Sequence, residues 1–306
     1  MIWVGGIMNR LLRGSAIFLF AFTVISFVYL ISRFLPNVHV SVKVLFFFGI
    51  PTLASLPIML RQPALFRGTN YPLLFGRSVF AVLAYGLTFL VISKLSLVDA
   101  TLLQNTAPLW IPLVALAWSG ERVPLKVVLG LIVGFLGVFL ILNPLSGFRF
   151  NIWIAAGLAS GVFYAIVIHA LKVLAGRLHP VTATFYYFLF CTLMVLPFAI
   201  ANWQPLDLRS LGLLVLAGLG YFVGLESVAY GMRYVSSAIA SSFCYVAILW
   251  AAIFDWVIWK QVPTIETALG AVLVIASGIS VVIFSRRSHP VEVHGVTNPT
   301  PESGNL

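Results

Sequence analysis

A carboxylate stands inside a long apolar run of this sequence, at Glu226, and its position suggests chemistry. Phe222, Tyr230 and Arg233 recur around it at helical spacing, so these side chains would share one face of a helix. An ionisable group within a membrane helix costs roughly 2.5–3.5 kcal/mol unless it is paired or wet. Two interpretations stay open: Glu226 binds a cationic group or a proton, or it pairs with Arg77 or Arg233 and locks the helices together.

Three further charged or titratable groups lie in apolar runs and are candidate coupling or gating residues. Asp255 shares a helical face with Tyr245, and its alternative role is an interfacial charge close to Lys260. His169 and Lys172 approach the same end of another run. A structural hydrogen bond is the alternative for His169.

Amides and prolines form a stripe on the fourth apolar run, at Gln104, Asn105, Pro108 and Pro112. Prolines free backbone carbonyls, and freed carbonyls within a membrane are tolerated only against protein or a water-lined cavity. The stripe therefore predicts a cavity wall with Gln104 and Asn105 facing the substrate. A helix–helix seam with hydrogen-bonded amides is the alternative.

Arg77 and Tyr85 align on the third run, where Arg77 meets either a substrate carboxylate or, by snorkelling, a lipid phosphate. Tyr29 lies on a polar stripe of the first run. The predicted substrate-binding residues are Glu226, Tyr230, Gln104, Asn105, Tyr85, Tyr245, Arg77 and Tyr29, and the predicted coupling or gating residues are Glu226, Asp255, His169 and Lys172.

The amino-acid composition indicates the class of protein in which these residues are placed. Of 306 residues, 61% are hydrophobic and 8% are charged, whereas a soluble domain carries about 25% charged residues. This composition excludes a cytosolic enzyme, a secreted disulfide module and a disordered protein, and it indicates a polytopic protein of the lipid bilayer. The 18 Lys and Arg residues stand singly or in pairs rather than clustered, so nucleic acid is not an expected partner.

Ten apolar runs have the length of about 20 residues that a membrane helix needs. The expected fold is an all-α polytopic membrane protein with ten transmembrane helices. The runs cover residues 14–33, 42–60, 72–94, 98–119, 125–143, 152–173, 181–202, 210–232, 236–259 and 264–284. We expect an N-terminal cytoplasmic segment over 1–13, a five-helix repeat over 14–143, a second over 144–284 and a disordered cytoplasmic tail over 285–306.

Basic residues predict the orientation of these helices. If the N-terminus is cytoplasmic, 12 of the 18 Lys and Arg residues fall on the inner side, as the positive-inside rule favours. A shift of 139 residues brings the second half onto the first, with Val-Pro124 meeting Val-Pro263. Five helices is an odd number, so the second repeat would be inverted, which is typical of transporters.

The stretch from Arg77 to Leu142 contains KLSLVDATLLQNTAPLWIPLVALAWSGERVPLKVVLGLIVGFLGVFLIL. It resembles the second part of an EamA module of the drug/metabolite transporter superfamily, with a tight turn, a proline-bearing helix, a Gly-Glu-Arg loop and a glycine-bearing helix. Residues 233–284 resemble the second copy but carry Trp259-Lys260-Gln261 where Gly-Glu-Arg would stand. The resemblance implies two inverted repeats, cytoplasmic termini, a central cavity and export or exchange of small metabolites.

The expected function is a secondary transporter working by alternating access. No phosphate loop, metal spacing or nucleophile–base pair is present in the sequence, so we expect no catalysis and no cofactor or metal. A carboxylate among cationic groups suits an amino acid or a related zwitterionic or cationic solute such as S-adenosylmethionine. The alternatives are an intramembrane lipid-acting enzyme and a channel or structural membrane protein. We expect a monomer or homodimer in a bacterial inner membrane.

Overall fold

The computed structural model describes residues 2–61, 70–120, 124–141, 152–174, 180–231, 234, 243–262 and 264–287. Every element in this part of the chain is helical, which confirms the predicted fold class. The elements are α1 (Ile2–Arg33), α2 (Val40–Arg61), α3 (Tyr71–Ile92), α4 (Leu97–Gln104), α5 (Ala107–Ser119), α6 (Leu125–Ile141), α7 (Ile152–Leu174), α8 (Pro180–Ala201), α9 (Leu208–Gly231), the 3-10 helix η3 (Phe243–Tyr245), α11 (Val246–Trp259) and α12 (Ile265–Arg287).

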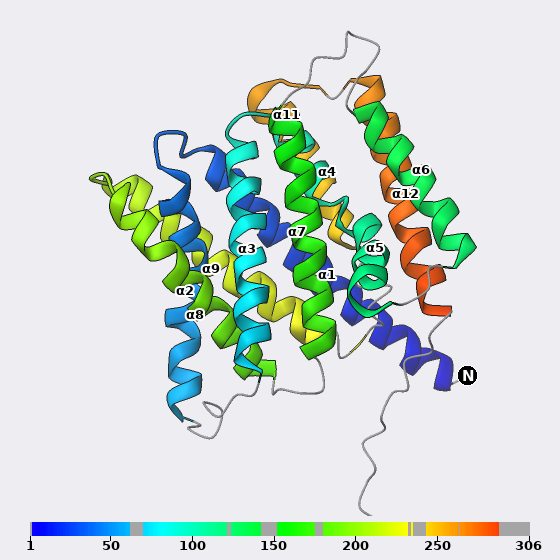
Figure 1. Cartoon of the computed structure of the whole chain (residues 1–306), viewed down its shortest axis with the longest axis horizontal. Helices are drawn as coiled ribbons and strands as arrows, with labels where there is room; N and C mark the ends of the chain where they lie inside the picture. Colours follow the sequence, from blue (N-terminus) through cyan, green and yellow to red (C-terminus); the bar gives the residue numbers. More distant parts are fainter. Residues whose placement is uncertain are drawn as a thin grey trace, which may run out of the picture.

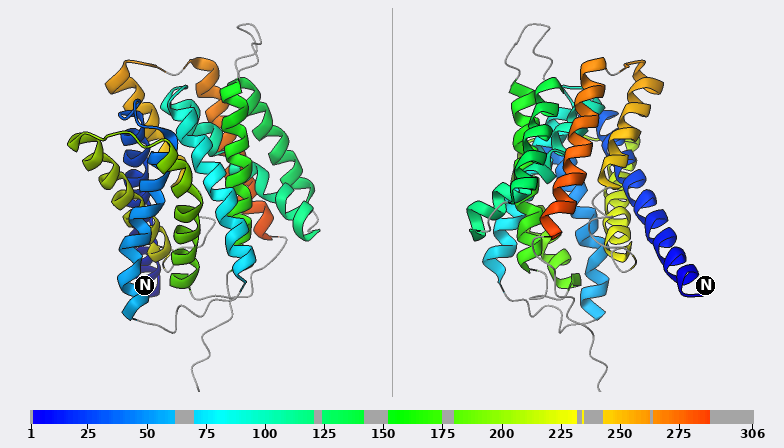
Figure 2. Two further views of the ribbon diagram at one scale, coloured as in Figure 1. Left: turned by 60° about the vertical axis from the view of Figure 1, so that its left-hand side comes forward. Right: turned by 90° about the vertical axis from the view of Figure 1, so that its right-hand side faces the viewer.

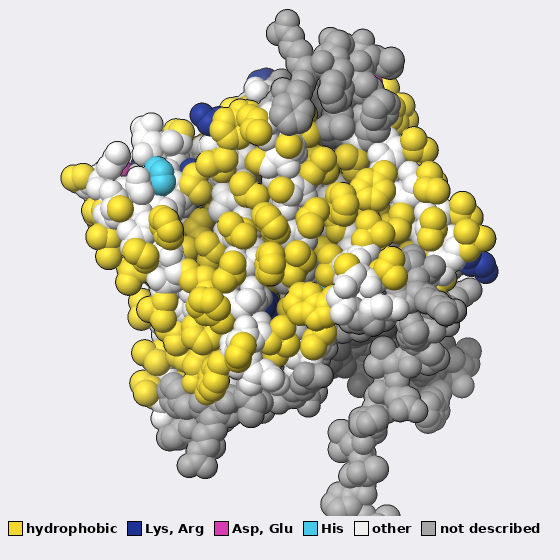
Figure 3. Space-filling model, in the orientation of Figure 1, with side chains coloured by type: hydrophobic (Ala, Val, Ile, Leu, Met, Phe, Trp, Pro, Cys, Tyr) yellow, Lys and Arg dark blue, Asp and Glu magenta, His cyan; other side chains and the backbone are white. Residues whose placement is uncertain are grey.

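Within the described residues, seven helical stretches are long and apolar enough to cross a membrane, with α4 and α5 counted together as Leu97–Trp118. Three shorter apolar helices, in α6, α11 and α12, complete the ten crossings. Large apolar side chains such as Leu53, Leu125 and Phe198 are exposed, and apolar side chains cover most of the face in Figure 3. The chain is therefore an integral membrane protein with multiple spans, as its composition predicted.

The two halves of the chain are built alike and pack across one another. A shift of 139 residues carries the start of α2 to within one residue of the start of α8, and the start of α6 to within one residue of the start of α12. The packing obeys the same relation, because α1 packs on α9 as α7 packs on α3, while α2 packs on α8 and α6 on α12. Figures 1 and 2 show α6 and α12 side by side at one edge.

Five crossings in each half make the second half inverted relative to the first. The start of α1 and the end of α12 accordingly lie at the same end of the bundle (Figure 1), called the N-terminal end below. The helix of α1 begins at Ile2, well before the apolar run expected from residue 14. Of the helix expected over 236–259, the part before residue 243 lies outside the described residues.

The fourth expected helix is divided into α4 and α5, and the division has a local cause. Pro108 cannot donate to the carbonyl of Gln104, and its ring crowds that carbonyl. The hydroxyl of Thr106 donates to the carbonyl oxygen of Leu103 (2.7 Å), which satisfies part of the interrupted backbone. A Cβ at Gly161 of α7 would lie 2.6 Å from that hydroxyl, so the interruption packs directly against α7.

The close approach of α9 to α2 depends on Gly218. A Cβ there would lie 2.5 Å from the carbonyl oxygen of Phe46. We expect Gly218→Ala to lower the free energy of unfolding by about 1–3 kcal/mol, the usual cost of overpacking. Gly212→Ala in the same helix is the control, because no neighbouring heavy atom of the described residues lies within 4 Å of a Cβ there. Equal melting temperatures of the two purified variants would contradict this close approach.

Candidate functional site

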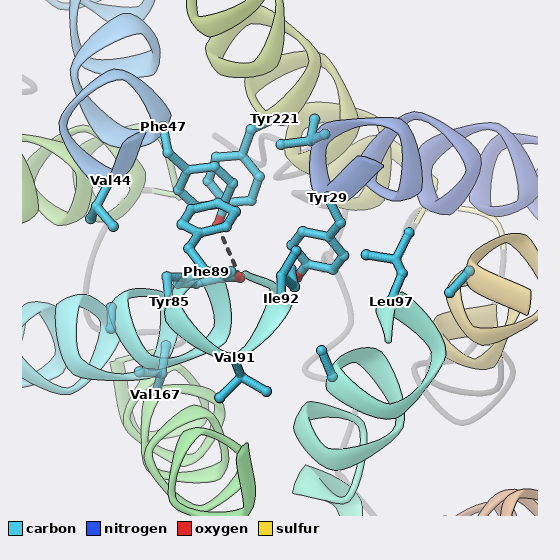
Figure 4. Close-up of a cluster of buried hydrophobic side chains, with 14 of the residues drawn as sticks. Tyr29, Val44, Phe47, Tyr85, Phe89, Val91, Ile92, Leu97, Val167 and Tyr221 are labelled. Atoms are coloured by element: carbon cyan, nitrogen blue, oxygen red, sulfur yellow. Dashed lines mark hydrogen bonds between the residues drawn. The ribbon is translucent and has the colours of Figure 1, made fainter. Parts of the chain in front are cut away.

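Five aromatic side chains from four helices meet inside the bundle. Tyr29 comes from α1, Phe47 from α2, Tyr85 and Phe89 from α3, and Tyr221 from α9 (Figure 4), and all are buried. The ring centroids of Phe47 and Tyr221 are 3.7 Å apart, and those of Phe47 and Tyr85 are 4.8 Å apart. Both halves of the chain thus contribute to one set of rings, called the central cluster below.

Hydrogen bonds pair the polar atoms of the central cluster. The hydroxyl of Tyr29 donates to Oε1 of Gln104 (2.9 Å), and the hydroxyl of Tyr221 donates to that of Tyr85 (3.2 Å; dashed in Figure 4). The amide nitrogen Nε2 of Gln104 is buried and has no hydrogen-bond partner among the described residues. Leaving a buried donor unsatisfied costs about 1–3 kcal/mol. The cluster therefore holds a donor that a ligand could satisfy.

Arg77 of α3 is buried about two helical turns from Tyr85, toward the N-terminal end. The residue is 7% exposed, and its guanidinium carbon lies 4.0 Å from the centroid of the Tyr187 ring. This burial excludes snorkelling to a lipid phosphate. Its Nε and Nη1 have no hydrogen-bond partner among the described residues. The ring of Phe48 contacts both Tyr187 and Tyr221, at 5.8 and 6.3 Å between centroids, and so connects Arg77 with the central cluster.

An ion pair joins the two halves at the end opposite the N-terminal end. Arg33 at the end of α1 pairs with Asp255 of α11, and its guanidinium lies 4.1 Å from the centroid of the Trp259 ring. The other carboxylate oxygen of Asp255 accepts the backbone N–H of Val98 in the first turn of α4 (2.8 Å). Asp255 is 1% exposed, so it is a buried carboxylate that connects α11 with α1 and α4 rather than an interfacial charge close to Lys260. Its gating role stays a prediction.

Three further predicted substrate residues are not among the five rings of the central cluster, although Tyr245 belongs to the same buried core. Asn105, which follows the last residue of α4, donates through Nδ2 to the carbonyl oxygen of Thr101 in that helix (2.8 Å). Tyr230 is 48% exposed, and its hydroxyl lies 2.8 Å from that of Tyr234. Tyr245 is buried in η3. A contact of any of these side chains with substrate stays a prediction.

The predicted coupling groups lie on three helices, α7, α9 and α11, and their coupling roles stay predictions. Glu226 is exposed on α9, and the described part of the chain contains no ion pair between it and Arg77. The other suggested partner, Arg233, lies outside the described residues. His169 is 2% exposed on α7, with its ring centroid 5.8 Å from that of Trp118. Lys172 lies on the same helix, but its side chain is outside the described residues.

Phe47, Tyr221 and Arg33 were absent from the predicted site. Phe47 stands in a run of three phenylalanines and Tyr221 beside Phe222, so the sequence did not mark which ring faces inward. Arg33 follows Tyr29 by four residues on the polar stripe of the first apolar run, but the sequence analysis assigned it no role in the site. Tyr29, Gln104 and Tyr85 are the predicted residues that the structure brings together.

Comparison with known proteins adds independent information. A model of the EamA-like transporter family matches residues 12–143 and again residues 151–284. The pseudopaline exporter CntI of Pseudomonas aeruginosa is 30% identical over 210 residues, which cover 68% of this chain and 74% of that protein. An uncharacterised transporter of Archaeoglobus fulgidus is 30% identical over 236 residues, covering 75% and 81%.

Two more distant likenesses agree with these. The riboflavin transporter of Vibrio cholerae is 24% identical over 177 residues, which cover 57% of this chain and 59% of that protein. A protein of known crystal structure superposes with a TM-score of 0.61 at 17% identity, over 90% of this chain and 99% of the other. At that identity, the superposition shows a shared fold alone.

Proposed function

We propose a cargo and a mechanism for this chain, which belongs to the EamA-like transporter family, within the drug/metabolite transporter superfamily. It is a transporter rather than an enzyme, which excludes the lipid-acting enzyme considered from the sequence. The proposed cargo is a small zwitterionic metabolite, an amino acid derivative or a solute such as S-adenosylmethionine. The proposed process is export across a bacterial inner membrane by alternating access.

Arg77 carries the proposal for a carboxylate on the cargo. Its guanidinium is buried in a membrane-spanning helix, with two nitrogen atoms unpartnered among the described residues. A buried charge without a partner is costly, and planar guanidinium groups bind carboxylates through two parallel hydrogen bonds. A carboxylate-bearing cargo would supply the missing partner while it is inside the protein.

The central cluster supports a cationic group at the other end of the cargo. Faces of tyrosine and phenylalanine rings attract ammonium and sulfonium groups, and Nε2 of Gln104 can donate to a polar atom between the charges. Arg77 and Tyr85 are eight residues apart on α3, a rise of about 12 Å along the helix axis. The proposed cargo therefore separates its charges by more bonds than a simple α-amino acid does.

Orientation and direction complete the proposal. The excess of Lys and Arg at the N-terminal end supports a cytoplasmic location for both termini. The name of the Pseudomonas aeruginosa relative, an exporter, supports outward transport. The Arg33–Asp255 pair lies between the central cluster and the opposite end, which suits a gate in an alternating-access cycle.

Counterflow in proteoliposomes tests the proposal. Vesicles loaded with unlabelled S-adenosylmethionine are expected to accumulate the labelled compound transiently and saturably. Decarboxylated S-adenosylmethionine is the matched ligand, and we expect it to compete at least tenfold more weakly, because losing a charged hydrogen bond costs about 1.5–3 kcal/mol. Flux without counterflow would identify a channel. Absence of counterflow with S-adenosylmethionine, and with lysine and arginine, whose side-chain cations lie several bonds from the carboxylate, would refute the proposed cargo class.

A further inference from the structure

A cavity of about 400 Å³ opens at the end of the bundle opposite the N-terminal end. The end of α1, the start of α2, the turn between α3 and α4 and the end of α11 surround it. Its size falls within the range of about 300–1,000 Å³ typical of sites for small molecules. It is separate from the central cluster, whose five aromatic residues are not among its lining residues.

The charged residues that line this cavity are all basic. They are Arg33, Lys43 and Lys94, and no aspartate or glutamate among the described residues lines it. Arg33 is already paired with Asp255. The described residues give neither lysine an acidic partner, and Lys43 donates to the backbone carbonyl of Ser32 (2.9 Å). The cavity therefore has an uncompensated positive charge.

Two buried polar groups distinguish this cavity from an exposed basic surface that water solvates. Lys43 is 4% exposed, and a buried ammonium is costly without an anion beside it. The hydroxyl oxygen of Ser32 is also buried, lines the same cavity and has no hydrogen-bond partner among the described residues. An anion placed between them would accept hydrogen bonds from both side chains.

The remaining lining favours an organic rather than an inorganic anion. Trp259, Ile92, Leu95 and Pro36 supply apolar surface beside the basic groups. We propose that this cavity is a second ligand site, which binds a small organic anion through Lys43, Ser32 and Lys94. A solute with two carboxylates, or with one carboxylate and a flat apolar part, fits this lining.

Equilibrium binding of labelled succinate to the full-length protein in phosphatidylcholine nanodiscs tests the proposal. At constant ionic strength, we expect saturable binding that unlabelled succinate displaces and the uncharged analogue succinamide does not. Lys94→Gln and Lys43→Gln are each expected to weaken binding at least tenfold. Arg209→Gln is the control, because Arg209 is an exposed cation at the same end that does not line the cavity.

Several outcomes would overturn the proposal. One is the absence of saturable succinate binding by the wild type, and another is unchanged affinity in Lys94→Gln, whose exposed side chain makes misfolding an unsuitable explanation. Loss of succinate binding in nanodiscs that contain phosphatidylglycerol would assign the cavity to a lipid head group. Counterflow of a zwitterion tests the central cluster and lysine-dependent succinate binding tests this cavity, so either proposal can fail alone.

Discussion

Replacing Asp255 with asparagine is expected to destabilise the folded protein by about 3 kcal/mol, because removing one partner of a buried ion pair leaves the other charge uncompensated. Asp255 is 1% exposed and Arg33 is 14% exposed at its side chain. The estimate is at the lower end of the range for such pairs because Arg33 keeps some contact with solvent. Thermal unfolding of the purified protein measures the effect.

The controls separate the charge from the side-chain shape. Asp207→Asn removes an exposed carboxylate at the same end of the bundle, and asparagine replaces aspartate well at the start of a helix. We expect it to leave stability within about 0.5 kcal/mol of the wild type. The double variant Arg33→Gln/Asp255→Asn is expected to be more stable than Asp255→Asn alone, since it contains no unpaired charge. A double variant at least as unstable as the single one would contradict this account.

The Asp255→Asn substitution also tests whether the Arg33–Asp255 pair acts as a gate. Thr101 of α4 is buried one turn beyond Val98, on the side of Gln104. In a chain with Cys191 and Cys244 replaced by serine, an introduced Thr101→Cys is expected to react slowly with an impermeant thiol reagent added at the opposite end. Adding Asp255→Asn should raise that rate at least tenfold, which corresponds to about 1.4 kcal/mol in the equilibrium between closed and open forms. An unchanged rate would show that the ion pair is structural only.

The sequence predicted the fold well because local features of the sequence determine the membrane-spanning helices. Apolar runs of membrane-spanning length fix the helices, and the 139-residue repeat predicts the exchange of packing partners between halves. The division of the fourth helix was harder to foresee. Proline kinks a helix or interrupts it depending on what packs there, and here Gly157 and Gly161 of α7 accommodate the interruption.

The site was predicted only in part, because its residues come from several helices and their meeting depends on long-range packing. Tyr29, Gln104 and Tyr85 meet as expected, since each is a polar group in an apolar helix that must face protein. Glu226 satisfied the same rule in sequence but is exposed on α9. Helical spacing relates residues of one helix to each other, whereas the rotation of that helix toward its neighbours depends on long-range packing. Gly224 shows this, because its approach to Ile25 of α1 fixes which face of α9 turns inward.

Arg77→Met is expected to reduce transport of a carboxylate-bearing cargo about 100-fold, because truncating one partner of a buried, hydrogen-bonded charge pair costs 2–5 kcal/mol or more. Methionine keeps an unbranched side chain beside Tyr187 but cannot bind a carboxylate. Arg77→Lys keeps the charge and loses the planar, two-pronged donor, so we expect intermediate activity. Initial rates of counterflow in proteoliposomes measure all three proteins, and Arg61→Gln, an exposed cation at the end of α2, controls for net charge.

The ligand comparison makes the test specific for the carboxylate. If Arg77 binds that group, Arg77→Met should lose its preference for S-adenosylmethionine over the decarboxylated compound, because neither can then form the charged hydrogen bonds. A structural role would instead lower the rates for both ligands by the same factor and preserve their ratio. The position of Arg77 on the ring of Tyr187, which Phe48 connects to Tyr221, explains why the first outcome is expected. A carboxylate at Arg77 places the rest of the cargo along these rings, where its cationic end reaches the central cluster.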